Sequence, residues 1–446
     1  MAEFETDGGA AGYEDGMVRI KGILYLCDES RLHRLSISNP KNKVAIVGDS
    51  FDERAKITDT AGSLSTESYA VWNLTNLLMS QRLDFIHIDG ISGTGALTGA
   101  SVYRNRIGAA IASGAHWCAL RASVNDFNPG TKSFDELVAE YSYLFATLNA
   151  AGMRVISNTV GPSNQLDTTA KRSVWAKFNQ WMLHTAPRLF DVVVIPQHYQ
   201  CADPDVLTGA AKSTLAVDGL HPDLPGAFLI AQTAASVLDP YLPNKSPLFG
   251  IAALGTADET AIDPNSINIG TSGAKGANVT GNVANGFSIR TTANGGTAVA
   301  SKVARTDGPG YWQQVVWTPD GAGKLLDFYS NGSAIALNAG FAIGDVVQYL
   351  CEIEVDAGSN PANVHYPYIL ITFAGANKTA KGFTTNSIHP ALNKAGWRGV
   401  IATPKMAIPD GTTGIYIQTS FYSKIAAEVT VRFGQHAMIN HSKTLA

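Results

Sequence analysis

The stretch Lys43-Val-Ala-Ile-Val-Gly-Asp-Ser-Phe-Asp52 joins an apolar strand to a turn that carries a serine. Residues 44–47 are apolar and mostly β-branched, which predicts a short buried strand that Gly48-Asp49-Ser50 interrupts. Because open α/β sheets bind ligands at the carboxyl ends of their strands, Ser50 is well placed for a nucleophile. An ordinary strand-turn-helix junction with a solvated serine explains this stretch as well. Whether Ser50 is a nucleophile or a solvated serine depends on which residues the rest of the chain supplies.

Apolar strands and amphipathic helices alternate from this stretch to about residue 242. The predicted strands cover residues 85–88, 117–122, 154–157 and 191–195, and the predicted helices cover 65–82, 103–113, 133–152 and 169–184. The helix over 133–152 begins with the capping box Ser133-Phe-Asp-Glu136 and ends at Gly152. This alternation predicts a parallel sheet with helices on both faces.

The pattern changes after Pro240. We interpret residues 243–265 as a linker, and residues 266–446 contain short alternating apolar runs between clusters of Gly, Pro, Asn and Asp. Such a pattern predicts a β-sandwich, of the jelly-roll type. We expect four parts: a partly disordered N-terminal segment with a hairpin (1–40), an α/β domain (41–242), the linker and the sandwich.

Composition restricts the classes of function. The chain has 446 residues and a net charge of −4, and only 16% of its residues are charged. Its length exceeds the ~250–300 residues of a single core, which favours two domains. The net negative charge argues against a nucleic-acid partner held by bulk electrostatics.

The cysteines and the N-terminus add further expectations. Four scattered cysteines, with neither CxxC pairs nor metal-ligand spacing, indicate no disulfide framework and no zinc site. We expect neither a metal nor another cofactor. The acidic N-terminus lacks an apolar core, and no window reaches the ~18 apolar residues of a membrane span, so we expect no secretory signal and no membrane anchor.

Polar groups follow the predicted strands in four blocks. These blocks are Gly48-Asp49-Ser50, Ile91-Ser-Gly93-Thr-Gly95, Val124-Asn125-Asp126 and Asp218-Gly-Leu-His221-Pro222. In composition and order they resemble the SGNH (GDSL-type) hydrolase superfamily, over residues 43–240. The resemblance implies a three-layer, flavodoxin-like α/β domain with a five-stranded parallel sheet, and serine esterase activity. The family usually has Gly at the place of Ser123, and we expect this serine to narrow the approach to the oxyanion hole.

The resemblance also implies roles for individual residues. Ser50 would be the nucleophile, His221 its general base and Asp218 the carboxylate that orients the imidazole. The backbone N–H groups of Ser50 and Gly93 and the side-chain amide of Asn125 would form the oxyanion hole. Gly95 is an alternative to Gly93.

Three further residues are predicted to belong to the substrate-binding region. Asp49 and Asp126 adjoin the motif residues, and they are also expected to hydrogen-bond their own loops. His198 follows the fifth strand, near the same edge of the sheet, where it would line the cleft.

The C-terminal region is rich in aromatic residues that could stack on sugar rings or fill the sandwich core. They include Tyr311, Trp312, Trp317, Tyr366, Tyr368, Trp397, Tyr416, Phe421 and Tyr422. With its Gly- and Asn-rich turns, the region resembles carbohydrate-binding jelly rolls and the distal domains of phage tail fibres and tailspikes.

Together these observations predict a serine esterase that removes O-acetyl groups from a polysaccharide such as a bacterial capsule or O-antigen. By analogy with tailspikes we expect homotrimers and a virion tail component, or an extracellular protein released by lysis, with a cytoplasmic protein as the alternative. Two alternatives stay open. One is a lipase, lysophospholipase or thioesterase of the same superfamily, and the other is a non-catalytic glycan- or receptor-binding protein.

Overall fold

The computed structural model describes the two main regions of the chain and short N-terminal strands. The described ranges are 42–67, 70–206, 210–242, 265–292, 295–307, 310–330, 335–337, 340–383 and 396–442, with the backbone of the strands before residue 42 and of 261–262. The N-terminal sheet has the order β1-β2-β3-β4, with bounds Ala2–Phe4, Gly16–Ile20, Ile23–Asp28 and Arg31–Arg34. The linker predicted at 243–265 lies outside the described residues, except for its end.

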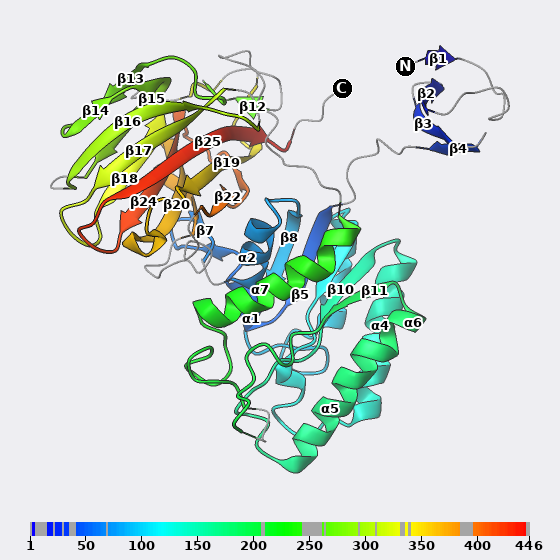
Figure 1. Ribbon diagram of the computed structural model, residues 1–446. Coiled ribbons are helices and arrows are strands. Elements are labelled where there is room, and N and C mark those ends of the chain that lie inside the picture. Colours follow the sequence, from blue (N-terminus) through cyan, green and yellow to red (C-terminus); the bar gives the residue numbers. More distant parts are fainter. Residues whose placement is uncertain are drawn as a thin grey trace.

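A five-stranded parallel sheet in the order β11-β10-β9-β5-β8 forms the centre of the α/β region (Figure 1). Its strands are β5 (Lys43–Gly48), β8 (Asp84–Gly90), β9 (Trp117–Leu120), β10 (Arg154–Asn158) and β11 (Val192–Ile195). Along the chain the order is flavodoxin-like, with its switch point between β5 and β9. The predicted three-layer fold is confirmed.

Helices cover both faces of this sheet. The helices are α1 (Ser50–Glu53), α2 (Val71–Leu78), α3 (Ile107–Ala112), α4 (Phe134–Ala150), α5 (Thr169–His184), α6 (Ala186–Leu189) and α7 (Leu224–Leu238), with short 3-10 turns η1 (Tyr103–Asn105), η2 (Val124–Asp126), η3 (Asp239–Tyr241) and η4 (Pro361–Asn363). Ala45 and Val47 pack in a cluster with α3, α4 and α5, whereas Val44 and Ile46 pack with α2 and α7. Because successive side chains of a strand point to opposite faces, a strand buried on both sides is continuously apolar.

The C-terminal region is a jelly roll. Its strands are β12 (Ala261–Ile262), β13 (Ser272–Lys275), β14 (Val279–Gly281), β15 (Val283–Thr291), β16 (Thr297–Ala304), β17 (Tyr311–Thr318), β18 (Leu325–Ser330), β19 (Val346–Val355), β20 (Val364–Ala374), β21 (Lys378–Gly382), β22 (Arg398–Ala402), β23 (Met406–Ala407), β24 (Gly414–Ser423) and β25 (Val429–Asn440). One sheet contains the order β17-β25-β19-β22, and the other contains β18-β24-β20-β21. These two orders are those of a jelly roll, which confirms the predicted fold.

The two main regions are joined by a shared sheet. Two short strands from the loop after α1, β6 (Ile57–Thr58) and β7 (Leu64–Ser65), extend the sandwich sheet, where β7 pairs with β21. The helix predicted over 65–82 is therefore shorter than expected. It begins only at Val71, because Leu64 and Ser65 belong to this pairing.

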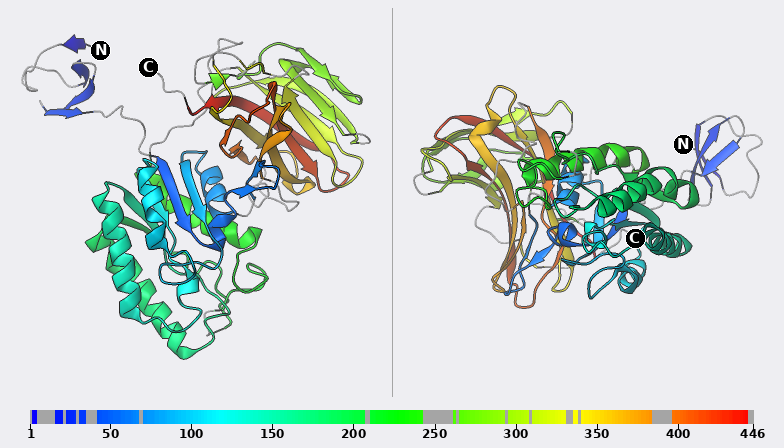
Figure 2. Two further views of the ribbon diagram at one scale, coloured as in Figure 1. Left: turned by 180° about the vertical axis from the view of Figure 1, so that it is seen from behind. Right: turned by 90° about the horizontal axis from the view of Figure 1, so that it is seen from below.

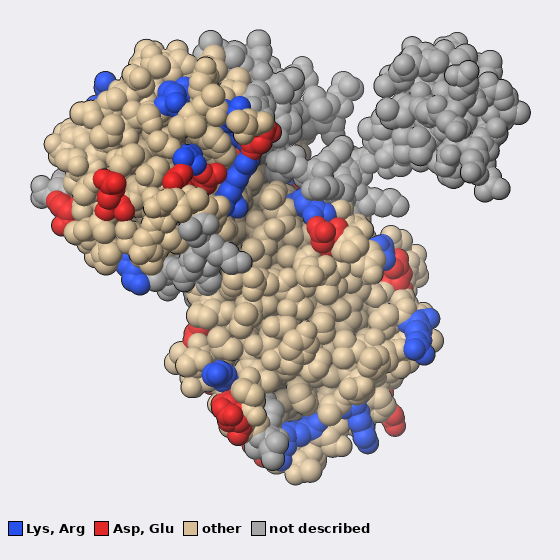
Figure 3. Space-filling view, in the orientation of Figure 1, with Lys and Arg blue, Asp and Glu red and all other residues tan. Residues whose placement is uncertain are grey.

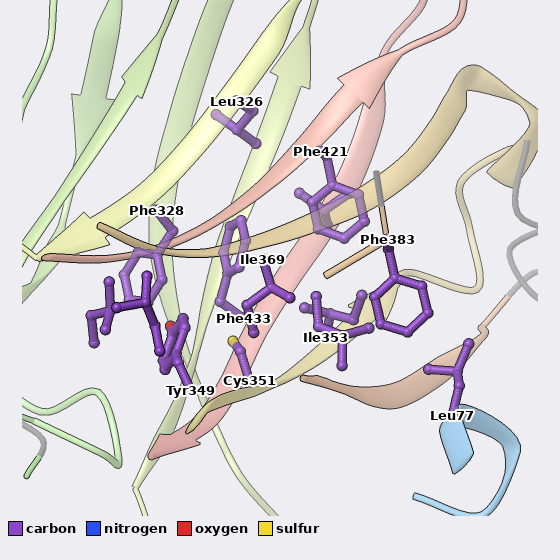
Figure 4. Packing of buried hydrophobic residues seen from close by; sticks show 14 of the residues in the cluster. Leu77, Leu326, Phe328, Tyr349, Cys351, Ile353, Ile369, Phe383, Phe421 and Phe433 are labelled. Carbon is purple, nitrogen blue, oxygen red and sulfur yellow. The ribbon is translucent and has the colours of Figure 1, made fainter. Parts of the chain in front are cut away.

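The two regions also share a hydrophobic core. Leu74 and Leu77 of α2 and Ile230 of α7 belong to the same buried cluster as the interior of the sandwich. Figure 4 shows Leu77 at one end of this cluster, near Phe383. The views in Figure 2 show the sandwich next to the α/β region from behind and from below. The jelly roll is therefore packed against the α/β region.

The exposure of the C-terminal aromatics differs from residue to residue. Trp317 and Phe421 are fully buried in the sandwich, as the core interpretation predicted. Trp312 is also buried, and the guanidinium groups of Arg305 and Arg398 lie 4.5 and 4.8 Å from its ring centre. Tyr311 is 40% exposed. On the face seen in Figure 3, acidic and basic side chains are few and intermixed.

Candidate active site

Ser50, His221 and Asp218 meet at the carboxyl edge of the parallel sheet. Ser50 follows β5 and begins α1, while the other two residues lie in the loop before α7. The Ser50 Oγ lies 2.7 Å from Nε2 of His221, and Nδ1 of that ring lies 2.6 Å from Oδ2 of Asp218. This arrangement allows the imidazole to accept the serine proton while the carboxylate holds the ring. The structure thus brings together the three residues that the sequence predicted as a triad.

The Asp218 carboxylate organises its own loop. Its Oδ1 accepts hydrogen bonds from the backbone N–H groups of Leu220 and His221, at 2.9 and 2.7 Å, and its Oδ2 accepts from the imidazole. Partial burial raises the pKa of Asp218, but these hydrogen bonds outweigh it and leave the pKa below the ordinary value. Asp218 therefore stays ionised through the mildly acidic range.

The turn that carries Ser50 is stabilised by its neighbours. Asp49 caps α1, and its Oδ1 accepts a hydrogen bond of 3.0 Å from the N–H of Phe51. The ring of Phe51 lies 5.2 Å from the His221 ring and 4.8 Å from the guanidinium carbon of Arg121. Phe51 therefore packs between the imidazole and a buried cation.

Arg121 is a site residue that the sequence analysis missed. Its guanidinium is buried and binds the Asp52 carboxylate through contacts of 2.5 and 3.1 Å, and Trp72 donates to that carboxylate at 3.0 Å. Arg121 Nε also lies 3.6 Å from Oδ1 of Asp49. An arginine inside the predicted apolar strand 117–122 was the signal that could have identified it, because buried charges need partners.

Replacing Arg121 by Met is expected to lower the free energy of unfolding by about 3–5 kcal/mol, because Asp52 would become a buried carboxylate without its cation. The control is Lys324→Met. Lys324 pairs with Asp320 at 3.5 Å, and both side chains are partly exposed, so the expected loss is at most about 1 kcal/mol. Urea denaturation followed by circular dichroism measures both losses, and equal losses would contradict the prediction.

Asp49 and Asp126 are buried, with 1% or less of their surface exposed, and their predicted role in substrate binding stays a prediction. Asp126 accepts hydrogen bonds from the N–H groups of Ala96 and Leu97, each at 2.9 Å, and from the Tyr141 hydroxyl at 3.1 Å. Burial raises the pKa of Asp126. These carboxylates support the loops, which is the other role expected from their positions.

Gly93 and Gly95 differ in what their amides do. The Gly95 N–H donates to the carbonyl of Thr98 at 2.8 Å, and a Cβ at Gly95 would lie 2.5 Å from the Asp126 carboxylate. Gly95 is therefore a packing position. Gly93 has φ of +73°, and among the described residues its N–H has no hydrogen-bond partner. Gly93 is the better candidate for an oxyanion donor.

Each of the remaining predicted donors has an N–H group for which no acceptor is found among the described residues. Within the described part of the chain, the backbone N–H of Ser50 has no hydrogen-bond acceptor. Asn125 donates from Nδ2 to the carbonyl of Thr94 at 2.9 Å, and an amide group has a second N–H. Ser50 and Asn125 therefore stay candidates for the oxyanion hole, together with Gly93.

Ser123 does not narrow the oxyanion hole, contrary to the expectation. Its side chain is fully buried, and the hydroxyl donates to Oδ2 of Asp49 at 2.6 Å. The same oxygen lies 3.1 Å from the carbonyl of Thr94 and accepts from the N–H of Asn125 at 3.2 Å. The hydroxyl therefore points into the protein, beneath the nucleophile turn.

His198 lies after β11 and contacts Thr159. Its backbone N–H and its Nδ1 are each 3.0 Å from the Thr159 hydroxyl, and burial lowers its pKa, which favours the neutral ring. The adjacent Tyr199 is 54% exposed. The predicted role of His198 in substrate binding stays a prediction.

Comparisons with solved structures find similar folds over 44–45% of the chain. No protein-family model matches the sequence, and no curated protein matches it significantly. Similar solved structures include a GDSL-like lipase from Bacteroides thetaiotaomicron VPI-5482 (16% identity, 45% of this chain, 90% of that chain, TM-score 0.33). A second is an acetylxylan esterase from Geobacillus stearothermophilus (17% identity, 44% of this chain, 94% of that chain, TM-score 0.34). A third is a carbohydrate esterase family 3 protein from Talaromyces cellulolyticus (18% identity, 45% of this chain, 97% of that chain, TM-score 0.32).

The part of the chain that the structure describes contains neither a metal-binding cluster nor a membrane-spanning helix. No group of three or more His, Cys, Asp or Glu side chains in this part of the chain could hold a metal ion. None of its helices is long and apolar enough to cross a membrane.

Proposed function

We propose that the protein is a serine esterase that removes O-acetyl groups from carbohydrate, with Ser50, His221 and Asp218 as its catalytic triad. The observation that carries the proposal is the continuous hydrogen-bonded series from the Ser50 hydroxyl through the imidazole to the carboxylate, with contacts of 2.7 and 2.6 Å. A serine hydroxyl is a weak nucleophile and needs such a base.

In the first half-reaction, Ser50 Oγ attacks the acetyl carbonyl carbon while its proton moves to Nε2 of His221. The negative charge on the carbonyl oxygen is stabilised by the N–H groups of Ser50 and Gly93 and by the Asn125 amide. His221 then gives the proton to the sugar oxygen as the C–O bond breaks. The products of this step are a free sugar hydroxyl and acetyl-Ser50.

In the second half-reaction, a water molecule gives a proton to His221 and attacks the acetyl carbon. The tetrahedral intermediate uses the same donors, and collapse returns the proton to Ser50 Oγ and releases acetate. Asp218 keeps the imidazole oriented and stabilises its charged form in both halves. Apart from the substrate and this water molecule, the two half-reactions use only groups of the chain itself.

Two features support a small acyl group and a sugar. A cavity that is lined in part by Phe51 and Leu220, but not by Ser50 or His221, has a volume of about 10 Å³, so it offers no room for a long acyl chain. The exposed Tyr199, on a loop at the same edge of the sheet, offers a flat surface for the apolar face of a sugar.

The proposed acyl specificity is tested with 4-nitrophenyl esters of increasing chain length. We expect kcat/KM for the acetate to exceed that for the decanoate by about 100-fold, because forcing extra methylenes among packed side chains typically costs about 1–3 kcal/mol. Acetate release from acetylated polysaccharides, measured beside the same polymers after chemical deacetylation, then tests the carbohydrate substrate. A preference for decanoate would favour the lipase alternative, and no turnover of any ester would favour the binding protein.

We further propose that the polysaccharide is of the capsule or O-antigen type and that the protein works as a tailspike-like component, with a homotrimer by analogy. The support is the combination of an esterase-type site with a jelly roll that carries an exposed aromatic residue, Tyr311. Acetate release from capsule and O-antigen preparations, together with light scattering of the purified protein, tests these points.

A further inference from the structure

The three segments that carry the proposed oxyanion donors converge on one buried hydroxyl. Ser123 Oγ contacts the Asp49 carboxylate beside the nucleophile, the Thr94 carbonyl beside Gly93 and the backbone N–H of Asn125. These contacts measure 2.6, 3.1 and 3.2 Å. A glycine at this position would have no side chain to make them.

The hydroxyl proton of Ser123 has two possible acceptors. A serine hydroxyl has a single hydrogen, so it can donate fully to either Asp49 Oδ2 or the Thr94 carbonyl. An ionised Asp49 attracts the hydrogen, which leaves the Asn125 amide as the donor to that carbonyl. A protonated Asp49 can donate to Ser123 instead, and the hydroxyl then turns to Thr94.

We propose that Ser123 is a positioning residue for the esterase reaction, holding the Ser50 turn, the Gly93–Thr94 loop and Asn125 in one hydrogen-bonded unit. The proposal rests on the proposed function, since it concerns the donors of the same oxyanion hole. Ser123 itself is fully buried and acts only through its neighbours.

The protonation state of Asp49 decides which form of the unit is present. The pKa of Asp49 is raised to about 6, chiefly by burial and in part by the nearby Asp52 carboxylate. Arg121 and the hydrogen bond from Ser123 lower this pKa and so limit the rise. The titratable groups that face Asp49 are Arg121 after β9, Asp52 in α1 and Tyr103 in η1. Removing the Ser123 hydroxyl therefore moves this titration to higher pH.

The test compares Ser123→Ala with Ser157→Ala, a matched loss of a buried hydroxyl. Ser157, on β10, donates to the carbonyl of Leu120 at 2.7 Å. With 4-nitrophenyl acetate, we expect Ser123→Ala to lower kcat about 10-fold with KM unchanged, less than the ~10²-fold that a 1 Å displacement costs. The acid limb of its pH profile moves to higher pH. Ser157→Ala keeps the kcat and the pH profile of the parent.

Thermal unfolding gives a second readout that needs no activity. Hydrogen bonds to an ionised group are roughly twice as strong as neutral ones, so Ser123→Ala should lower Tm more at pH 8, where Asp49 is ionised, than at pH 5. Ser157→Ala lowers Tm equally at both. Equal losses for Ser123→Ala at both pH values, or an unchanged acid limb and kcat, would overturn the proposal. An inactive parent protein would overturn the proposed function, and the thermal comparison would still test the Ser123–Asp49 bond.

Discussion

Replacing Ser50 by Ala is expected to lower kcat for 4-nitrophenyl acetate by about 10⁴- to 10⁶-fold, the range found when a nucleophile is removed from a triad. The variant keeps the packing of Phe51 and the cap of Asp49, so its stability should be close to that of the parent. The matched control is Ser113→Ala. Ser113 donates to the carbonyl of Ala110 at the end of α3, and its loss should leave kcat unchanged.

The other two residues of the proposed triad sharpen this prediction. His221→Ala should lower kcat about as much as Ser50→Ala does. The double variant should lower kcat no more than either single variant, because the residues act as a unit. Asp218→Asn should cost less than the ~10⁴-fold reported for a buried triad aspartate, since the Asp218 side chain is 54% exposed and water shares its role. Additive losses for Ser50 and His221 would contradict a shared proton-transfer step.

The sequence was sufficient to predict which residues lie together where a short motif holds them. His221 follows Asp218 by three positions, and one tight loop places both beside Ser50. The capping box is equally local, and the bonds between Ser133 and Glu136 are present in both directions. In each case the partners are held by backbone turns that the motif itself encodes.

Side-chain direction and long-range pairing could not be obtained in this way. The Ser123 hydroxyl points inward because of Asp49, 74 positions earlier, and nothing local indicates that choice. The strand Leu64–Ser65 has only two residues, which is too short to show an alternation of apolar and polar residues. Its partner β21 begins far along the chain, at Lys378. Motifs therefore located the residues of the proposed triad, but not the contacts that join the two regions.

The packing of α2 against the sandwich is the basis of the second prediction with a large expected effect. Leu77→Ala is expected to lower the free energy of unfolding by about 2–5 kcal/mol, because Leu77 is almost fully buried in the cluster that α2 shares with the sandwich, near Phe383 (Figure 4). Leu189→Ala is the control, since Leu189 is 63% exposed and its loss should change stability by no more than about 0.5 kcal/mol.

The same variant tests whether the two regions unfold together. The shared sheet, the shared cluster and the bond from Gln81 Nε2 to the Val400 carbonyl at 2.9 Å all cross between them. The proposed esterase activity follows the α/β region in urea, and far-ultraviolet circular dichroism follows the secondary structure of both regions together. We expect coincident midpoints in the parent and an equal shift of both in Leu77→Ala, because coincident transitions by independent probes mark one cooperative unit. Two separated midpoints, only one of which Leu77→Ala moves, would show that the jelly roll folds independently of the esterase region.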